Sequence, residues 1–287
     1  MIINLRLIEK CNYNCEYCTM HSNKKTIFTY EKFALFIKKI MEYEKFAKVF
    51  IYGGEPFLYD IEILKKIIFL SSIYNLKIIF QTNLSDQSFA KIKTLLKLLK
   101  NKSRFYINAS YHQDFENFNN FLKKLIFLNA KNILNEIAFM DEEKNYDQYF
   151  ELKERFNKVE FCPLINGNVL FDHDKNIASK SLINLEKKDI FKKLNNDYHF
   201  KLNYYHWKNN DCNNYNQKCY IAFHEIHYFN DKIYYCLNDA VYDKNFINNE
   251  AFNFKNYQKS IICPYKKCFF DMQYFDRNYK GSKKYET

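Results

Sequence analysis

Residues 49–80 read VFIYGGEPFLYDIEILKKIIFLSSIYNLKIIF, and this stretch decides the fold class. It opens with an apolar run that predicts a β-strand ending at Gly53-Gly54. Asp60 is suited to cap a helix whose apolar residues recur on one face, namely Ile61, Leu64 and Ile68. A second apolar run at 77–80 predicts the next strand. A strand, a helix and a strand in this order form one unit of a parallel sheet.

The same unit recurs through the first 165 residues. Apolar runs predict six strands, at 2–8, 49–52, 77–80, 105–109, 133–140 and 159–165. Amphipathic segments between them predict crossover helices, at 29–46, after Asp60, around 89–99, at 118–126 and at 146–156. Six strands form either an open doubly wound sheet or an incomplete barrel. In both architectures ligands bind at the carboxyl ends of the strands.

The composition fits one medium domain with a small appendage. The chain has 287 residues, of which 47% are hydrophobic and 27% charged, so global disorder is excluded. No run of 18 apolar residues occurs and the N-terminus lacks the pattern of an export signal, so we expect a cytoplasmic protein without a membrane span. The net charge is +11, but the lysines are spread over helix faces, so nucleic acid is not an expected partner.

The nine cysteines are the most informative residues of the chain. Because their number is odd and no export signal is present, we expect metal or redox chemistry rather than disulfides. Cys11, Cys15 and Cys18 form a C-x3-C-x2-C pattern just after the first predicted strand. Three thiolates in one loop can hold three irons of a [4Fe–4S] cube and leave the fourth iron open. Zinc is the competing interpretation, with His21 as the fourth ligand.

This cysteine loop resembles the signature of radical S-adenosylmethionine (SAM) enzymes, in which an aromatic residue, here Tyr17, precedes the third cysteine. The run Gly53-Gly54-Glu55-Pro56, one βα unit later, is similar to the family's GGEP motif, whose backbone meets the methionine part of SAM. The resemblance implies a partial (β/α)6 barrel over residues 1–170. It also implies that the open iron chelates SAM and that the reduced cluster cleaves it to a 5′-deoxyadenosyl radical, which abstracts a substrate hydrogen.

Two other strand ends carry polar residues with counterparts in that family. Asn83 follows the third strand, where members often show a Thr-Asn pair near SAM, and Ser110 ends the fourth, where a serine often contacts the ribose or carboxylate. The resemblance therefore implies that both bind the cofactor, and the alternative is that they cap strand ends. Cys162, late in the sixth strand, is interpreted either as a packing residue or as a thiol facing the barrel mouth.

The pattern changes after about residue 170. We expect a helical connector at 171–200 and a small Cys-rich α+β domain at 201–287, with a β-hairpin at 223–236 whose turn is Asn230-Asp231. The layout resembles the Twitch domain, the shortened relative of SPASM domains, which binds an auxiliary [4Fe–4S] cluster. The resemblance implies four ligands, with Cys212 as a substitute for one of them: Cys219, Cys236, Cys263 and Cys268. Two departures are the C-x4-C spacing of the last pair and the missing hairpin glycine, so structural zinc and unliganded cysteines remain alternatives.

Three hypotheses for the function follow. In the first, a closed auxiliary cluster accepts an electron from a substrate radical, which gives net oxidation of a small molecule such as a sugar alcohol or an aminocyclitol-like group. In the second, the chain modifies a peptide or protein side chain, as peptide-maturing and sulfatase-maturing relatives do. The second is weakened because the chain starts directly at the first strand, without a leader-binding domain. The third is a basic RNA-binding module stapled by zinc.

The oxidation hypothesis requires further groups. A proton acceptor is needed near the substrate, and the candidates at strand ends are His112, Asp114 and Asp141, whereas Glu136 lies too early in its strand. The family resemblance also implies that a reducing flavodoxin or ferredoxin supplies the electron.

Overall fold

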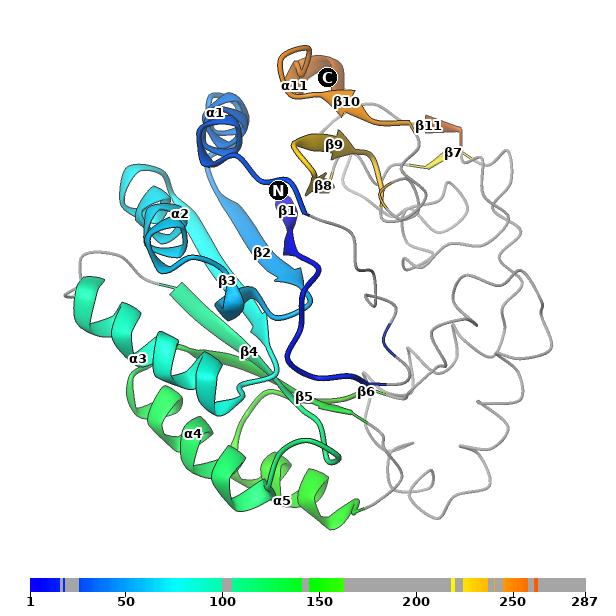
Figure 1. The fold of residues 1–287 in the computed structure, drawn as a ribbon. Coiled ribbons are helices and arrows are strands. Elements are labelled where there is room, and N and C mark those ends of the chain that lie inside the picture. The colour runs from blue at the N-terminus through cyan, green and yellow to red at the C-terminus, as the bar shows by residue number, and fades with distance from the viewer. Residues whose placement is uncertain are drawn as a thin grey trace.

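The computed structural model describes residues 1–15, 18, 26–99, 105–140, 145–162, 218–219, 224–236, 240, 245–257 and 261–262. The described chain is a mixed α/β fold built on a parallel sheet (Figure 1). Six strands follow one another across it: β1 (Ile2–Ile8), β2 (Ala47–Gly53), β3 (Leu76–Thr82), β4 (Phe105–Tyr111), β5 (Leu134–Met140) and β6 (Val159–Cys162). Each pairs in parallel with the next. The α/β class and the six-stranded parallel sheet predicted from the sequence are therefore confirmed.

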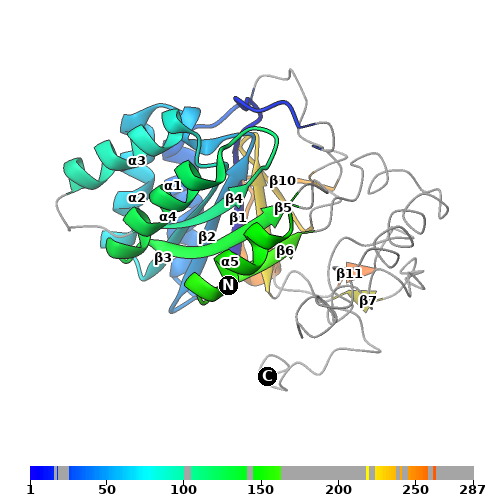
Figure 2. The same ribbon diagram turned by 90° about the horizontal axis from the view of Figure 1, so that it is seen from below.

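Helices connect these strands and cover one face of the sheet (Figure 2). They are α1 (Tyr30–Met41), the 3-10 turn η1 (Pro56–Leu58), α2 (Ile61–Ile73), α3 (Asp86–Leu99), α4 (Phe118–Ala130) and α5 (Asp147–Arg155). Residues on each strand alternate between this covered face and the opposite one, because successive side chains of a strand point to opposite sides. In β1 the covered positions Ile3, Leu5 and Leu7 are fully buried, whereas Asn4 and Arg6 face the other side.

Two details of the helices test the sequence patterns. Asp60 caps α2 as predicted, since its Oδ1 accepts hydrogen bonds from the backbone N–H groups of Glu62 and Ile63 at 2.9 and 3.0 Å. The helix predicted at 29–46 ends earlier, at Met41. The next position of its apolar stripe is Glu44, so nothing extends the buried face, and the chain turns into β2 instead.

The predicted hairpin is present, and it extends the same sheet. β8 (Glu225–Phe229) and β9 (Lys232–Tyr234) pair in antiparallel fashion around the Asn230-Asp231 turn. β8 also pairs in parallel with β1, from Ile2 opposite Glu225 to Arg6 opposite Phe229. With β10 (Ile247–Asn248) the sheet order becomes β10-β9-β8-β1-β2-β3-β4-β5-β6. Part of the predicted C-terminal domain is thus hydrogen-bonded to the first strand of the barrel.

The remaining described elements are short. β7 (Lys218–Cys219) pairs with β11 (Ile261–Ile262), and α11 (Phe254–Tyr257) follows β10. The connector predicted at 171–200 lies outside the described residues, so the division at 170 and 200 stays a prediction. Within the described part of the chain, no helix has the length and apolar character needed to span a membrane.

Candidate active site at the carboxyl ends of the strands

The loop after β1 carries the three predicted cluster ligands. It lies at the carboxyl end of a parallel strand, where ligand sites of such folds are found. Cys11 and Cys18 are half-buried, and Cys15 is buried. The Cys11 sulfur accepts hydrogen bonds from the Tyr13 backbone N–H at 3.4 Å and from the Asn83 side-chain amide at 3.7 Å. The Cys18 backbone N–H donates to the Cys15 carbonyl at 3.0 Å. Burial is the main cause that raises the pKa of the Cys11 thiol, and the nearby Cys18 adds to it.

Gly53 and Gly54 bring the end of β2 against the base of this loop. The Gly54 N–H donates to the Ile8 carbonyl at 2.7 Å and the Glu55 N–H donates to the Lys10 carbonyl at 2.9 Å. A Cβ on Gly53 would lie 2.0 Å from the Ile8 oxygen, and one on Gly54 would lie 2.2 Å from the Lys10 oxygen. Gly53 also has a φ of +136°, which side-chain-bearing residues rarely adopt. The glycines are therefore required by contact with the residues that lead into the cysteine loop.

Glu55 is fully buried and joins three segments of the site. Its carboxylate accepts hydrogen bonds from the Phe57 N–H at 3.1 Å, the Asn83 N–H at 2.8 Å and the Thr82 hydroxyl at 2.9 Å. Burial raises the pKa of Glu55 to about 7, although these donors oppose the shift. Its carboxylate is thus occupied by the protein itself, and it fixes the turn after β3. Pro56, the next residue of the motif, is buried at the start of η1.

Asn83 connects that turn with the cysteine loop. It is buried, and its side-chain amide donates to the Asn12 side-chain oxygen at 2.9 Å as well as to Cys11. Its backbone N–H is the group bound by Glu55. A chain of contacts therefore runs from Glu55 through Asn83 to Cys11. The sequence pattern selected Asn83 for cofactor binding, and the structure places it beside a predicted cluster ligand.

His112 also contacts the cysteine loop. Its Nδ1 lies 3.6 Å from the Cys15 sulfur, and its ring packs edge-on against Tyr13 at 5.7 Å between centroids. Tyr13 in turn stacks on Phe115 at 4.7 Å. The segment after β4 therefore forms one wall of the loop. Among the other candidate proton acceptors, Asp114 is exposed in the turn after β4, and Asp141 lies outside the described residues.

The remaining predicted site residues are placed only in part. Ser110 is half-buried on β4, on the face away from the helices, and Tyr17 lies outside the described residues. Of the predicted auxiliary ligands, Cys236 is buried just after β9. Cys219 lies opposite Ile261 in the β7–β11 pair, and Cys263 follows that pair by one residue in the sequence. Cys212, Cys263 and Cys268 are outside the described residues.

Two contacts that sequence patterns did not select close the base of the loop. The Thr26 hydroxyl oxygen accepts a hydrogen bond from the Glu9 N–H at 3.0 Å. The chain enters the loop at Glu9 and leaves it at Thr26, so this bond closes a narrow neck at the base of the loop. Arg6 pairs with Glu9 at 2.8 Å, and its guanidinium lies over the Phe229 ring at 4.4 Å. The signal was present in the sequence, because Arg6 is the one charged residue in a mainly apolar predicted strand.

A carboxyl pair lies on the open face of β5 and β6. Burial and the neighbouring Glu160 raise the pKa of Glu136 to about 7. Burial, with these carboxylates adding to it, raises the pKa of Cys162 to about 12, so this thiol is protonated at neutral pH. Cys162 is half-buried, and its two interpretations from the sequence, a packing residue or a thiol facing the barrel mouth, both stay predictions. Glu136 was set aside because it lies early in its strand, and the structure shows it beside a second carboxylate.

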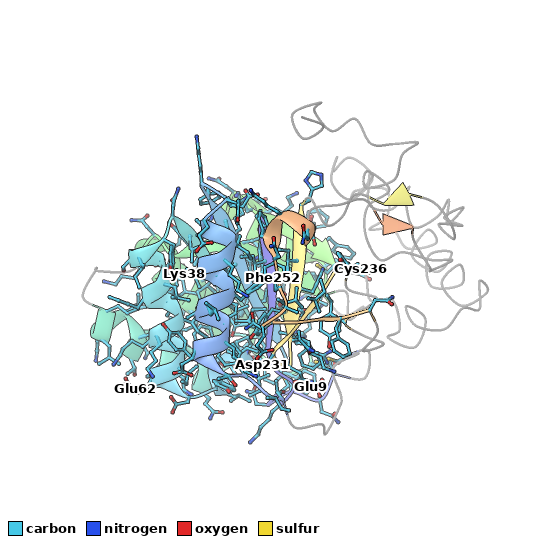
Figure 3. All side chains as sticks on the ribbon, turned by 90° about the horizontal axis from the view of Figure 1, so that it is seen from above. Glu9, Lys38, Glu62, Asp231, Cys236 and Phe252 are labelled. Atoms are coloured by element: carbon cyan, nitrogen blue, oxygen red, sulfur yellow. The ribbon has the colours of Figure 1, made fainter. Side chains whose placement is uncertain are left out.

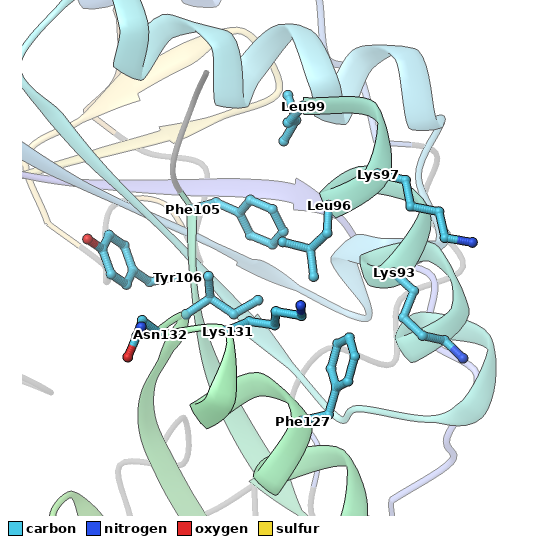
Figure 4. Close-up of a pocket in the computed structure, with 10 residues that line it drawn as sticks. Lys93, Leu96, Lys97, Leu99, Phe105, Tyr106, Phe127, Lys131 and Asn132 are labelled. Carbon is cyan, nitrogen blue, oxygen red and sulfur yellow. The ribbon is translucent and has the colours of Figure 1, made fainter. Parts of the chain in front are cut away.

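A pocket of about 830 Å³ lies away from this site, between the C-terminal ends of α3 and α4 (Figure 4). Its walls include Leu96, Phe105 and Phe127, and its rim includes Lys97 and Lys131. These helix ends lead into the amino ends of β4 and β5. The pocket is therefore at the opposite edge of the sheet from the cysteine loop and is no part of the candidate site.

The donor set of the loop fits an iron–sulfur cluster. Three cysteines from one loop are the ligands of a cube with one open iron, and the Asn83 amide points at one of their sulfurs, as suits a thiolate. Within the described residues, no three His, Cys, Asp or Glu side chains are gathered closely enough to hold a metal ion. Cluster assembly would thus draw the three thiols of the loop together.

The sequence profile of the Radical SAM superfamily matches residues 5–129. This range includes the cysteine loop, the GGEP run and Asn83, so this part of the chain is similar in sequence to radical SAM domains. A [4Fe–4S] cluster and SAM are the cofactors of that superfamily. No curated protein matches the sequence.

Two solved structures share the fold. One is anSMEcpe with bound AdoMet and Kp18Cys peptide, with a TM-score of 0.59 and 19% identity, covering 89% of this chain and 79% of that chain. The other is SuiB from Streptococcus suis bound to precursor peptide SuiA, with a TM-score of 0.55 and 12% identity, covering 90% of this chain and 64% of that chain. At such low identity these likenesses concern the fold alone.

Proposed function

We propose that this protein is a radical SAM enzyme whose [4Fe–4S] cluster is held by Cys11, Cys15 and Cys18. The observation that carries the proposal is the meeting of three features at one edge of the sheet. The cysteine loop follows β1, the glycine-rich end of β2 packs against its base, and Asn83 from the end of β3 donates to Cys11. Polar residues at neighbouring carboxyl ends of parallel strands form the ligand site of such folds.

The chain's own residues have separate tasks in this proposal. When bound, the cluster and SAM supply a 5′-deoxyadenosyl radical that abstracts a hydrogen atom from the substrate. The Asn83 amide stabilises the negative charge on the Cys11 sulfur. Glu55 holds Asn83 in place. The Gly53-Gly54 segment and the Ser110 hydroxyl would contact SAM at the same edge.

The neighbouring structures favour a peptide or protein side chain as the substrate. Both contain a peptide in addition to the enzyme chain. Oxidation of a small molecule, such as a sugar alcohol, is the second candidate. The zinc-stapled RNA-binding module gains no support from the match to the radical SAM profile.

An auxiliary [4Fe–4S] cluster on the C-terminal cysteines would accept one electron from the substrate radical while a protein base takes its proton, which gives a net two-electron oxidation. The antiparallel pair of β7 and β11 supports this part of the proposal, since it brings Cys219 opposite the segment that directly precedes Cys263. Cys236 is buried at the end of the hairpin. A cytoplasmic flavodoxin or ferredoxin would supply the reducing electron.

Iron and sulfide analysis after anaerobic reconstitution tests the proposal. We expect about eight irons in the wild type and about four in the Cys11/Cys15/Cys18→Ala variant. With dithionite as reductant, the wild type and a Cys162→Ala control should form 5′-deoxyadenosine from SAM, and the triple variant should not. Unchanged iron in the triple variant would refute the assignment of the loop. About four irons in the wild type and none in the triple variant would refute the auxiliary cluster and leave the assignment of the cysteine loop intact.

A further inference from the structure

The turn of the C-terminal hairpin contacts the return end of the cysteine loop. The Asn230 side-chain oxygen accepts a hydrogen bond from the Ile27 N–H at 2.9 Å. Asp231 accepts two more from Thr29, from the backbone N–H at 3.0 Å and from the hydroxyl at 2.6 Å. These contacts join residues about 200 positions apart in the sequence. They bind two of the residues that lead from the loop into α1, Ile27 and Thr29.

The sequence of the turn suits this contact. Asn230 and Asp231 have φ angles of 51° and 58°, the left-handed conformation of a two-residue hairpin turn. Glycine would adopt this conformation at less cost but has no side chain to offer. The turn lacks the hairpin glycine of the Twitch pattern. The two residues that form it instead, Asn230 and Asp231, therefore supply two side-chain acceptors.

Asp231 binds the residue that precedes the first turn of α1. Thr29 is the N-cap residue, and its own side chain makes no capping hydrogen bond. The Asp231 carboxylate, which is 8% exposed, accepts from the N–H and the hydroxyl of Thr29 itself, so it lies near the positive end of the helix dipole. Tyr228 orients it by donating a hydrogen bond at 3.2 Å. The Asp231 carboxylate is thus buried and fixed by hydrogen bonds from both Thr29 and Tyr228.

The loop is held at two successive points as a result. The first is the neck, where Glu9 donates to Thr26. The second is the hairpin turn, which binds residues 27 and 29. Figure 3 shows Asp231 at one end of the hairpin and Cys236 at the other. The hairpin therefore connects a predicted auxiliary ligand with the loop of the first three cysteines.

We propose that the Asn230-Asp231 turn is a clamp that positions the cysteine loop, with Asp231 as a positioning residue. The role of this clamp in holding a cluster rests on the proposed function. The hydrogen bonds of the clamp themselves need no cluster and are present in the cluster-free chain. Loss of the clamp should loosen the loop without unfolding the barrel. Cys15, which is 7% exposed, should then become more accessible to reagents.

Alkylation of the cluster-free protein tests this clamp. Iodoacetamide labelling of each cysteine is followed by peptide mass spectrometry, and the Cys15 rate is divided by the Cys162 rate to correct for global opening. We expect Asp231→Ala to raise this ratio at least fivefold. Asp60→Ala, which removes the N-cap of α2, is the matched control and should leave the ratio unchanged. Equal ratios in the two variants would overturn the proposal.

Further variants keep the test decisive if Asp231→Ala folds poorly. Thr29→Val removes only the 2.6 Å hydrogen bond from the Thr29 hydroxyl, and it should raise the ratio less than Asp231→Ala does. An unchanged ratio in Thr29→Val together with Asp231→Asn would also overturn the clamp. In reconstituted protein, Thr29→Val should release iron to a chelator faster than wild type. A raised labelling ratio with no iron bound by the wild-type loop would uphold the clamp and refute the cluster assignment.

Discussion

Glu55 illustrates how one residue serves the site without being exposed to it. The resemblance to the GGEP motif selected it for cofactor binding, whereas the structure buries its carboxylate completely. Phe57, Thr82 and Asn83 all donate to it. Its observed contribution is to hold the turn after β3, and through it the amide that faces Cys11.

The raised pKa of Glu55 predicts a pH dependence of stability. Its pKa is about 7 in the folded chain against an ordinary value of 4.5, so the folded state binds an extra proton between these pH values. The unfolding free energy should therefore fall as pH rises from about 4.5 to 7, by roughly 3 kcal/mol from this group. Urea unfolding of the cluster-free protein across this range checks it. Glu55→Gln should show a flatter profile.

An exposed carboxylate provides the control for this measurement. Glu62 on α2 has a side chain that is 58% exposed. Glu62→Gln removes a carboxylate without changing the buried network, and its profile should follow the wild type. If Glu55→Gln keeps the full pH dependence, another group causes it.

At the scale of elements, a buried lysine joins α4 to the turn that carries Asn83. Lys124 is 3% exposed, and its ammonium donates to the Leu84 carbonyl at 2.9 Å. It also pairs with Glu116 and Asp86, each at 2.8 Å. Leu84 has a φ of 54°, so the turn adopts a conformation that needs such support.

Replacement of this lysine should be costly. Lys124→Met leaves the Glu116 carboxylate, which is 8% exposed, buried without its cation. We expect a loss of about 3 kcal/mol in unfolding free energy, because an uncompensated buried charge remains. Chemical denaturation measures it. The neighbouring Lys123 is exposed, so Lys123→Met should change stability by less than about 0.5 kcal/mol. Glu116→Gln added to Lys124→Met should recover part of the loss.

The periodicity of apolar residues predicted the helices and strands correctly, but it did not always predict where they end. All six parallel strands and Asp60 as a helix cap were predicted from local patterns. Lys124 was missed because a lysine on an apolar face contradicts the pattern, and only the fold reveals the carboxylates that meet it. Ile126 falls in the apolar stripe of the helix predicted at 118–126 but is 51% exposed, since helical position alone does not say how far a neighbouring element covers the helix.

The candidate site divides in the same way. The cysteine loop, the glycine pair and Asn83 carry spacing and composition that a sequence displays. The contact of Asp231 with Thr29 spans 202 positions and depends on β8 lying beside β1, so no local pattern contains it. His112 was selected as a proton acceptor, and its observed partner is Cys15. The role of a polar residue thus depends on the side chains that the fold brings to it.

At the scale of the whole molecule, the hairpin is packed as part of the barrel. Tyr228 of β8 is fully buried, and its ring lies 5.2 and 5.0 Å from Phe33 and Phe36 of α1. Lys39 of α1 donates to the carbonyls of Asn249 and Phe252 at 3.0 and 3.1 Å. Aromatic packing and backbone contacts on this scale predict that the hairpin and the barrel unfold together.

Hydrogen exchange can decide between one cooperative unit and two. The Ile2 N–H donates to the His224 carbonyl at 2.8 Å, and β1 and β8 share five paired positions. We therefore expect the slowest amides of β1 and β8 to open with the same free energy. Tyr228→Ala should lower both by about 3 kcal/mol, because it removes a buried aromatic side chain from the shared core. Phe69→Ala, at a position that is 50% exposed, is the control and should leave both nearly unchanged. If β8 opens first while β1 stays protected, the hairpin is a separate folding unit, and the clamp on the cysteine loop can open independently of the barrel.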